Sequence, residues 1–256
     1  MILDLNCDMG EVPSAIEDGT QEMLMHWITS ANVACGGHAG DQHTMTATVE
    51  QALRANVAIG AHPGYPDRAR FGRHAMDMPV DAVRDFVFEQ VRALSAVTDR
   101  LGAAITHVKP HGALYNQAVR NAALAEAIAQ GVKRWSGDVV LVGLAGSPML
   151  DVFRDCGFTA AAEAFADRRY QPDGTLRSRS FDDALIRDPT EAAQQALNIA
   201  ASGSVTAHNG DTIALSARTI CIHGDTPGAL QIVVAVAETL REAGITLRAL
   251  SNRQSS

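Results

Sequence analysis

Five short apolar runs in this chain end directly in residues that carry acid–base or ligand chemistry. The runs and the segments that follow them are 2–6 with 7–11, 31–34 with 35–41, 57–61 with 62–67, 105–108 with 109–112 and 220–222 with 223–225. A short apolar run is typical of a buried strand, and in parallel sheets the functional groups follow the carboxyl ends of the strands. We therefore expect one end of a parallel sheet or barrel to carry an active site.

Helical patterns alternate with these runs along the chain. Helices are predicted over 42–55, 81–100, 121–135, 148–155, 190–202 and 227–243, and further strands over 139–142, 158–162 and 245–250. Asp81 is expected to cap the second of these helices. Because residues suited to catalysis follow nearly every predicted strand, the pattern favours a seven-stranded (β/α) barrel of the TIM-barrel type. An open, doubly wound sheet would gather the chemistry at one switch point.

Composition limits the class of protein and its partners. A length of 256 residues with 46% hydrophobic residues suits one barrel, so we expect a single catalytic domain over 1–250 and a frayed tail over 251–256. The net charge of −8, with no basic run, argues against nucleic acid and anionic membranes as partners. No long apolar segment, signal peptide or CxxC pair occurs, which predicts a cytoplasmic protein with reduced thiols. The oligomeric state stays open, and a homo-oligomer is compatible with the sequence.

Lysine occurs only at Lys109 and Lys133, against nineteen arginines. Lys109 lies between His107 and His111, where a compact ammonium group was retained in an arginine-rich chain. Two interpretations are open. In one, His107 and His111 bind a metal. In the other, Lys109 binds a carboxylate or phosphate and His111 transfers protons.

The loop after the second apolar run brings a thiol close to an imidazole. Cys35 and His38 would form a nucleophilic pair, or Cys35 is only a small buried residue. Gly36 and Gly37 would let backbone amides face an anion, next to Asp41.

Other loops offer further acid–base groups. Asp8 is either a site carboxylate or one that fixes its own loop. His62 is held in a loop stiffened by two prolines, which suits metal binding or proton transfer. In the segment 223–225, Asp225 either orients His223 or caps the last helix.

Longer strings in the chain resemble a known family. They are Asp4–Glu11, Ser30–Asp41, Gly60–Asp67, Phe71–Arg73, His107–Asn116, Phe165–Arg168 and Cys221–Pro227. Together they resemble the LamB/YcsF family nearly end to end, whose characterised members are the A subunits of bacterial ATP-dependent 5-oxoprolinases. The resemblance implies a seven-stranded barrel akin to polysaccharide deacetylases. It also implies ring opening of 5-oxo-L-proline (pyroglutamate) with ATP and water to L-glutamate, ADP and phosphate, together with the B and C subunits of 5-oxoprolinase as partners.

Site residues follow from the motifs and the resemblance together. The expected catalytic residues are Asp8, His38, Lys109, His111, His223 and Asp225. Expected contacts to substrate or cofactor are Asn6, Glu11, Gly36, Gly37, Asp41, His62, Asp67, Arg73, Tyr115, Asn116, Glu163, Asp167 and Arg168. Candidate ligands of a divalent metal, Mg²⁺ or Zn²⁺, are Asp8, His62 and His111, by analogy with distant deacetylase-like barrels.

The hypothesis for the mechanism assigns a role to each charged group. Lys109 and Arg168 would stabilise carboxylate or phosphate oxygens. His111 or His223 would act as general base toward water, helped by Asp225. ATP is the expected cofactor, but no GxxxxGK[ST] loop occurs, so its contact is non-standard or belongs partly to a partner. Two alternatives stay open: a metal-dependent amidohydrolase or deacetylase acting on a carbohydrate or cyclic amide without ATP, and a non-catalytic protein with a binding or regulatory role.

Overall fold

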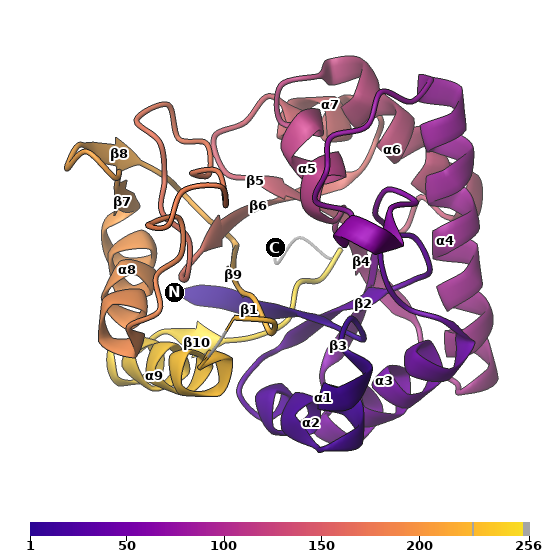
Figure 1. Cartoon of the computed structure of the whole chain (residues 1–256). Coiled ribbons are helices and arrows are strands. Elements are labelled where there is room, and N and C mark those ends of the chain that lie inside the picture. Colours follow the sequence, from indigo (N-terminus) through magenta and orange to yellow (C-terminus); the bar gives the residue numbers. More distant parts are fainter. Residues whose placement is uncertain (227, 253–256) are drawn as a thin grey trace.

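Seven parallel strands close into a barrel in the computed structural model, which describes residues 1–226 and 228–252 (Figure 1). They are β1 (Ile2–Met9), β2 (Ser30–Ala34), β3 (Ala58–His62), β4 (Ile105–Val108), β5 (Val140–Leu144), β6 (Thr159–Phe165) and β9 (Thr219–Ile222). Each strand pairs with the next, and β9 pairs back to β1 with Asn6 opposite Cys221. The predicted seven-stranded barrel is therefore confirmed, and the open sheet is wrong. A short strand, β10 (Thr246–Leu247), adds to the start of β1.

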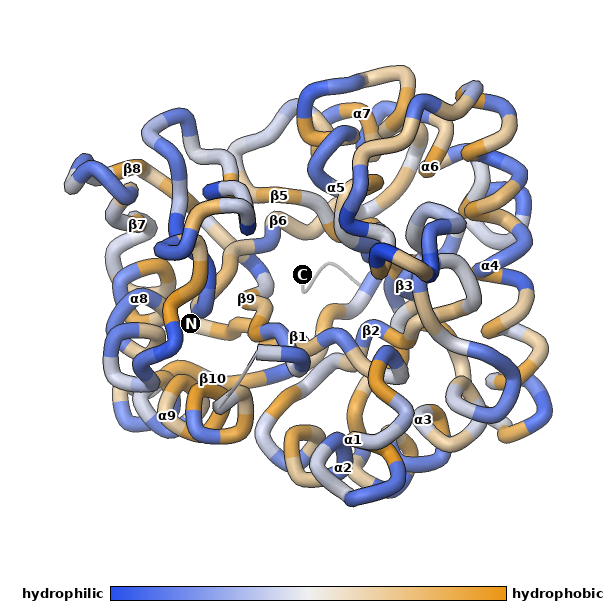
Figure 2. Tube along the Cα trace, viewed as in Figure 1, coloured by the Kyte–Doolittle hydropathy of each residue, from blue (hydrophilic) through white to orange (hydrophobic). Residues whose placement is uncertain are grey.

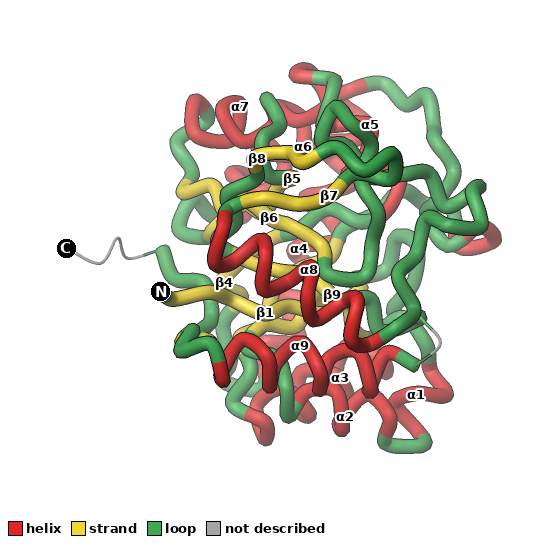
Figure 3. Tube along the Cα trace, turned by 90° about the vertical axis from the view of Figure 1, so that its left-hand side faces the viewer, coloured by secondary structure: helices red, strands yellow, loops and turns green. Residues whose placement is uncertain are grey.

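Helices surround the barrel and cover the outer faces of its strands (Figure 1). They include α3 (Gln42–Ala55), α4 (Val80–Arg100), α6 (Ala122–Trp135), α7 (Met149–Asp155), α8 (Pro189–Ser202) and α9 (Ala229–Glu242). Hydrophilic and hydrophobic residues alternate along these helices (Figure 2), as expected for helices with one buried face. Figure 3 shows α8 and α9 side by side over the strands that close the ring.

Pro79 occupies the N-cap position of α4, so Asp81 lies inside the first turn and the prediction that it caps this helix is wrong. The predicted start of the last helix at Pro227 lies outside the described residues, and Gly228 is the N-cap of α9. The division into a barrel over 1–250 and a tail over 251–256 stays a prediction, because 253–256 also lie outside the described residues.

Several short elements were not anticipated. They are α1 (Pro13–Glu17), α2 (Thr20–Met25), the 3₁₀ turn η1 (Arg68–Arg70), α5 (Gly112–Ala118) and the antiparallel hairpin β7 (Ser204–Thr206) with β8 (Thr212–Ala214). Elements of three to seven residues are too short to establish a periodic pattern. In the part of the chain that the structure describes, no helix combines the length and the apolar character that a membrane span requires.

A layer of hydrogen-bonded polar side chains crosses the inside of the barrel. The Asn32 amide nitrogen donates to Asn6 Oδ1 at 2.7 Å and to Asp8 Oδ1 at 2.8 Å. Because the amide oxygen of Asn32 must then accept, His107 donates to it from Nε2 at 2.9 Å. Burial lowers the pKa of His107 to about 3, which keeps its ring neutral. The layer therefore fixes the position of the Asp8 carboxylate.

Gly60 makes room for this layer. A Cβ at this position would lie 2.1 Å from Nε2 of His107, whose ring is already held by Asn32. We expect Gly60→Ala to destabilise the protein by about 1–3 kcal/mol, the usual cost of overpacking a core. Thermal unfolding measures the effect. Gly137→Ala is the matched control, because a Cβ there meets nothing within 4 Å, and it should leave the unfolding temperature unchanged. Equal stability of the two variants would contradict the expectation.

Candidate active site

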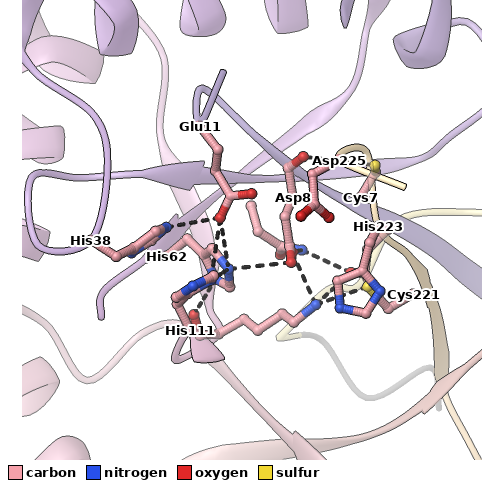
Figure 4. Close-up of polar contacts among 12 residues, drawn as sticks. Cys7, Asp8, Glu11, His38, His62, His111, Cys221, His223 and Asp225 are labelled. Carbon is pink, nitrogen blue, oxygen red and sulfur yellow. Dashed lines mark hydrogen bonds and ion pairs between the residues drawn. The ribbon is translucent and has the colours of Figure 1, made fainter. Parts of the chain in front are cut away.

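A cavity of about 860 Å³ lies at the carboxyl ends of the barrel strands. Lys109, His111 and His223 line it from loops after β4 and β9, and Arg168 lines it from the loop after β6. The segment 171–180 and helix α5 form further walls. This is the end at which (β/α) barrels carry their active sites. Figure 4 shows the polar side chains that meet there.

Lys109 lies at the centre of a buried charge cluster. Its ammonium is 3.0 Å from Asp8 Oδ1 and 2.9 Å from Glu163 Oε1. It also donates to Cys221 Sγ at 3.0 Å and to Asn6 Oδ1 at 3.3 Å. Burial alone would lower the pKa of Lys109, but the facing Asp8 and Glu163 outweigh it and raise that pKa well above its usual value. The lysine is therefore a permanent cation that offsets two buried carboxylates.

His223 is oriented by Asp167, not by Asp225. Its Nδ1–H donates to the Asp167 carboxylate, with both oxygens at 3.0 Å, and its backbone N–H donates to Oδ2 at 2.9 Å. When the ring is neutral, Nε2 is then its basic nitrogen, on a residue that lines the cavity. Burial opposes ionisation of Asp167, but His223 lowers the pKa of that carboxyl. Asp167 and His223 lie 56 positions apart, so the loop after β6 supplies the partner.

Asp225 instead pairs with two arginines at the rim. It contacts the guanidinium groups of Arg73 and, at 3.7 Å, Arg179. Both interpretations of Asp225 from the sequence, as the partner of His223 and as the cap of α9, are wrong, since Gly228 caps that helix.

Arg168 is a buried cation with an unused donor. Only 5% of the residue is exposed, and one terminal nitrogen donates to the carbonyl of Arg177 at 2.7 Å. Its Nε has no hydrogen-bond partner among the described residues. Burial, together with the nearby charge of Arg179, lowers the pKa of Arg168 to about 10. Such a group is suited to bind an anion that enters the cavity.

Three imidazoles and one carboxylate form a second cluster beside Asp8. Glu11 Oε1 is 2.8 Å from His38 Nε2, 3.2 Å from His111 Nδ1 and 3.8 Å from His62 Nε2. The ring of His38 stacks on that of His111 with 3.5 Å between centroids. Burial lowers the pKa of His38 to about 3. These donor atoms lie close enough together to bind one metal ion.

Of four other predicted site residues, two line the cavity and two do not. Tyr115 and Asn116 line it from α5. Asp41 caps α3 by accepting from the Thr44 backbone N–H at 2.9 Å, so it acts in the fold. Asp67 precedes the 3₁₀ turn and does not line the cavity.

The glycine loop after β2 packs against its neighbours. The N–H of Gly36 donates to the Ala39 carbonyl at 2.8 Å, and a Cβ on Gly37 would lie 2.4 Å from the Gly64 carbonyl. These glycines therefore do not line the cavity, and their amides form no anion nest there. Burial raises the pKa of Cys35 to about 12, which argues against a nucleophilic thiolate.

Sequence reasoning missed two polar contributors. Asn32 orients Asp8 from inside β2, and Arg179 pairs with Asp225 at the rim. A polar residue inside the apolar run 31–34 was a usable signal for Asn32. Arg179 lies in an arginine-rich loop that gave no sign of which member would face the cavity.

Comparisons with known proteins give a consistent result. The profile of the LamB/YcsF family matches residues 3–255. The chain is 47% identical over 246 residues to the A subunit of 5-oxoprolinase from Chloroflexus aggregans, covering 96% of this chain and 98% of the relative. It is 49% identical over 247 residues to the A subunit of 5-oxoprolinase from Bordetella pertussis, with the same coverage.

Solved structures agree with this result. The crystal structure of a lactam utilization protein from Thermus thermophilus superimposes with a TM-score of 0.90 at 40% identity, covering 98% of this chain and all of that one. A family 4 carbohydrate esterase from Streptomyces lividans has a TM-score of 0.52 at 12% identity, with 98% of each chain covered, and so shares the fold alone.

Proposed function

Because this chain belongs to the LamB/YcsF family, we propose that it opens the lactam ring of 5-oxo-L-proline to give L-glutamate, in a reaction driven by ATP. It acts as the A subunit of a multi-subunit 5-oxoprolinase in the cytoplasm. Relatives that carry the name of this 5-oxoprolinase component, and a lactam utilization protein, support a 5-oxoprolinase role. The observation that carries the proposal is one cavity that contains an oriented imidazole, His223, and the partly unpaired cation Arg168.

Arg168 recognises the carboxylate of the substrate. 5-Oxoproline is a five-membered lactam with one carboxylate, and the guanidinium of Arg168, which lines the cavity, supplies a charge-assisted hydrogen bond to it. Arg73 and Arg179 add positive charge at the rim, although Asp225 partly neutralises them. A carboxylate bound there leaves the lactam carbonyl free to face Lys109, which also lines the cavity.

Coupling to ATP activates the lactam carbonyl, which by itself is a weak electrophile. Transfer of the γ-phosphoryl group to the lactam oxygen releases ADP and makes the carbonyl carbon easier to attack. Water then adds to that carbon, the C–N bond breaks and the ring nitrogen takes a proton, leaving an acyl phosphate. A second water displaces phosphate and gives glutamate. Lys109 stabilises negative charge that develops on oxygen during these steps. This chain has no phosphate-binding GxxxxGK[ST] loop, so it either holds ATP through other groups or shares that contact with the B and C subunits.

His223 removes the proton from the attacking water. Its Nδ1–H is held by Asp167, so the basic Nε2 belongs to a ring of fixed orientation and tautomer. Asp167 acts through His223 and is a positioning residue. This arrangement follows the same logic as the aspartate–histidine pair of serine proteases.

Asp167→Asn tests this arrangement. An asparagine amide either faces the Nδ1–H of His223 with its own N–H or forces the ring into the other tautomer. We expect kcat to fall by about 10²–10⁴-fold, with a smaller change in KM. Nitrogen chemical shifts of His223 should show the change of tautomer, which a purely structural role would not produce. A variant with normal kcat and an unchanged tautomer would contradict the assignment.

Reconstitution tests the function as a whole. The purified chain is combined with its partner subunits, 5-oxoproline and ATP, and glutamate is measured. ATP-dependent glutamate formation that requires this chain is the expected result. Glutamate formed by this chain without ATP would favour the amidohydrolase alternative. A thermal shift with 5-oxoproline but no turnover in the complete mixture would favour a binding or regulatory role.

A further inference from the structure

We propose that Glu11, His62 and His111 form a binding site for a divalent metal ion of the zinc type, with a fourth position open to the cavity. The three residues follow β1, end β3 and follow β4, so strands of one barrel deliver them to one point. All three line the cavity, whereas His38, the fourth member of the cluster, does not. Metal binding at this site does not depend on the lactam reaction proposed above, although both use the same cavity.

The outer nitrogens of the two histidine ligands are already committed. His62 donates from Nδ1 to the Lys109 carbonyl at 2.7 Å, and His111 donates from Nε2 to the Phe71 carbonyl at 2.8 Å. In its neutral form each ring carries its one proton on that outer nitrogen, so Nε2 of His62 and Nδ1 of His111 then both present lone pairs inward. Metal-binding histidines are held in this way, with the other ring N–H on a backbone carbonyl or a carboxylate.

The two inward nitrogens lie only 3.0 Å apart. Two facing lone pairs at that distance repel each other unless a positive species lies between or beside them. The species is either a shared proton or a metal ion. The carboxylate oxygen of Glu11 faces the same point, at 3.2 Å from His111 and 3.8 Å from His62, and adds the negative charge that a divalent ion requires.

The spacing suits a four-coordinate ion. Ligands at about 2.0–2.1 Å from Zn²⁺ in a tetrahedral site lie about 3.3 Å from one another. The three ligand–ligand distances here, 3.0, 3.2 and 3.8 Å, bracket that value. Two histidines and one glutamate are a ligand set that Zn²⁺ takes in catalytic sites, where the remaining position binds water or substrate.

Glu11, and not Asp8, completes the set. Asp8 Oδ1 is occupied by Lys109 and Asn32, and its other oxygen lies 3.4 Å from His62. His38 supports the site by donating to Glu11 at 2.8 Å and stacking on His111. The ligand set is therefore different from the Asp8, His62 and His111 set that the sequence suggested.

Metal binding by the purified full-length chain tests the site. The protein is stripped with a chelator, and Zn²⁺ and Co²⁺ are then titrated in competition with a chelating indicator. We expect one ion per chain and, with Co²⁺, the intense visible absorption of a low coordination number. Glu11→Gln, His62→Gln and His111→Gln should each weaken binding by at least about 100-fold, and His38→Gln by roughly 10-fold. His43→Gln, on the exposed start of α3, is the matched control and should bind as the parent does.

The possible outcomes distinguish a bound metal ion from a proton shared between His62 and His111. Weak, non-stoichiometric binding by the parent protein, or binding that none of the ligand substitutions changes, overturns the proposal. A Co²⁺ spectrum like that of the hydrated ion also overturns it and leaves a shared proton between His62 and His111. Circular dichroism of each variant checks folding, and the Co²⁺ spectrum of the parent protein decides even if a variant misfolds. The titration contains no substrate or partner subunit, so a negative result for metal binding can be told apart from a failure of the lactam reaction.

Discussion

Lys109→Met is expected to abolish ATP-dependent ring opening. The substitution removes a cation that lines the cavity and faces both Asp8 and Glu163. Glutamate production by the reconstituted complex should fall below detection, because charge that develops on the reacting oxygen is no longer offset. The variant should also lose about 3–5 kcal/mol of folding free energy, since two buried carboxylates are left without a partner.

A second substitution separates the loss of activity from the loss of stability. Glu163→Gln added to Lys109→Met removes one of the two unpaired charges while keeping the shape of the side chain. We expect this double variant to regain much of the unfolding free energy, measured by denaturant titration, while activity stays absent. Lys133→Met is the control, because Lys133 is the other lysine and its ammonium donates to the Cys156 carbonyl on the outside of the barrel. Normal turnover by a folded Lys109 variant would remove this residue from the mechanism.

Arg168→Met is expected to weaken substrate binding without weakening the fold. A charge-assisted hydrogen bond to the carboxylate is worth about 1.5–3 kcal/mol, so KM for 5-oxoproline should rise by roughly 10–100-fold. Stability should stay equal or increase, because a buried cation with an unpaired donor is replaced by an apolar side chain. Steady-state kinetics and thermal unfolding measure the two effects.

The neighbouring arginine provides the control for this prediction. Arg169 pairs with Glu191 at 2.7 Å and does not line the cavity. Arg169→Met should therefore leave KM unchanged. An unchanged KM in Arg168→Met, or equal effects in both variants, would contradict the role of Arg168 as the carboxylate site.

Much of the architecture could be read from local patterns. The strand ends at 7–11, 35–41, 62–67, 109–112 and 223–225 all lie at one end of the observed barrel. Pro189 and Gly203 bound α8 as their backbone preferences predict, since proline suits a first helical turn and glycine a left-handed C-cap. These features depend on nearest neighbours in the chain. The hairpin of β7 and β8 was missed because three-residue strands carry too little pattern.

The pairing of charged groups could not be predicted in the same way. His223 was matched with Asp225 because they are neighbours in sequence, yet Asp167 holds it across 56 positions. Glu11 was expected to contact substrate or cofactor, and it lies among three imidazoles. The roles of the site residues in catalysis stay predictions.

The sequence by itself determined which residues reach the functional end of the barrel, because each follows its own strand directly. Only the tertiary structure decided which of them meet. Closure of β9 onto β1 sets the distances between side chains that are far apart in the chain, and burial then decides which carboxylate each cation or imidazole must face.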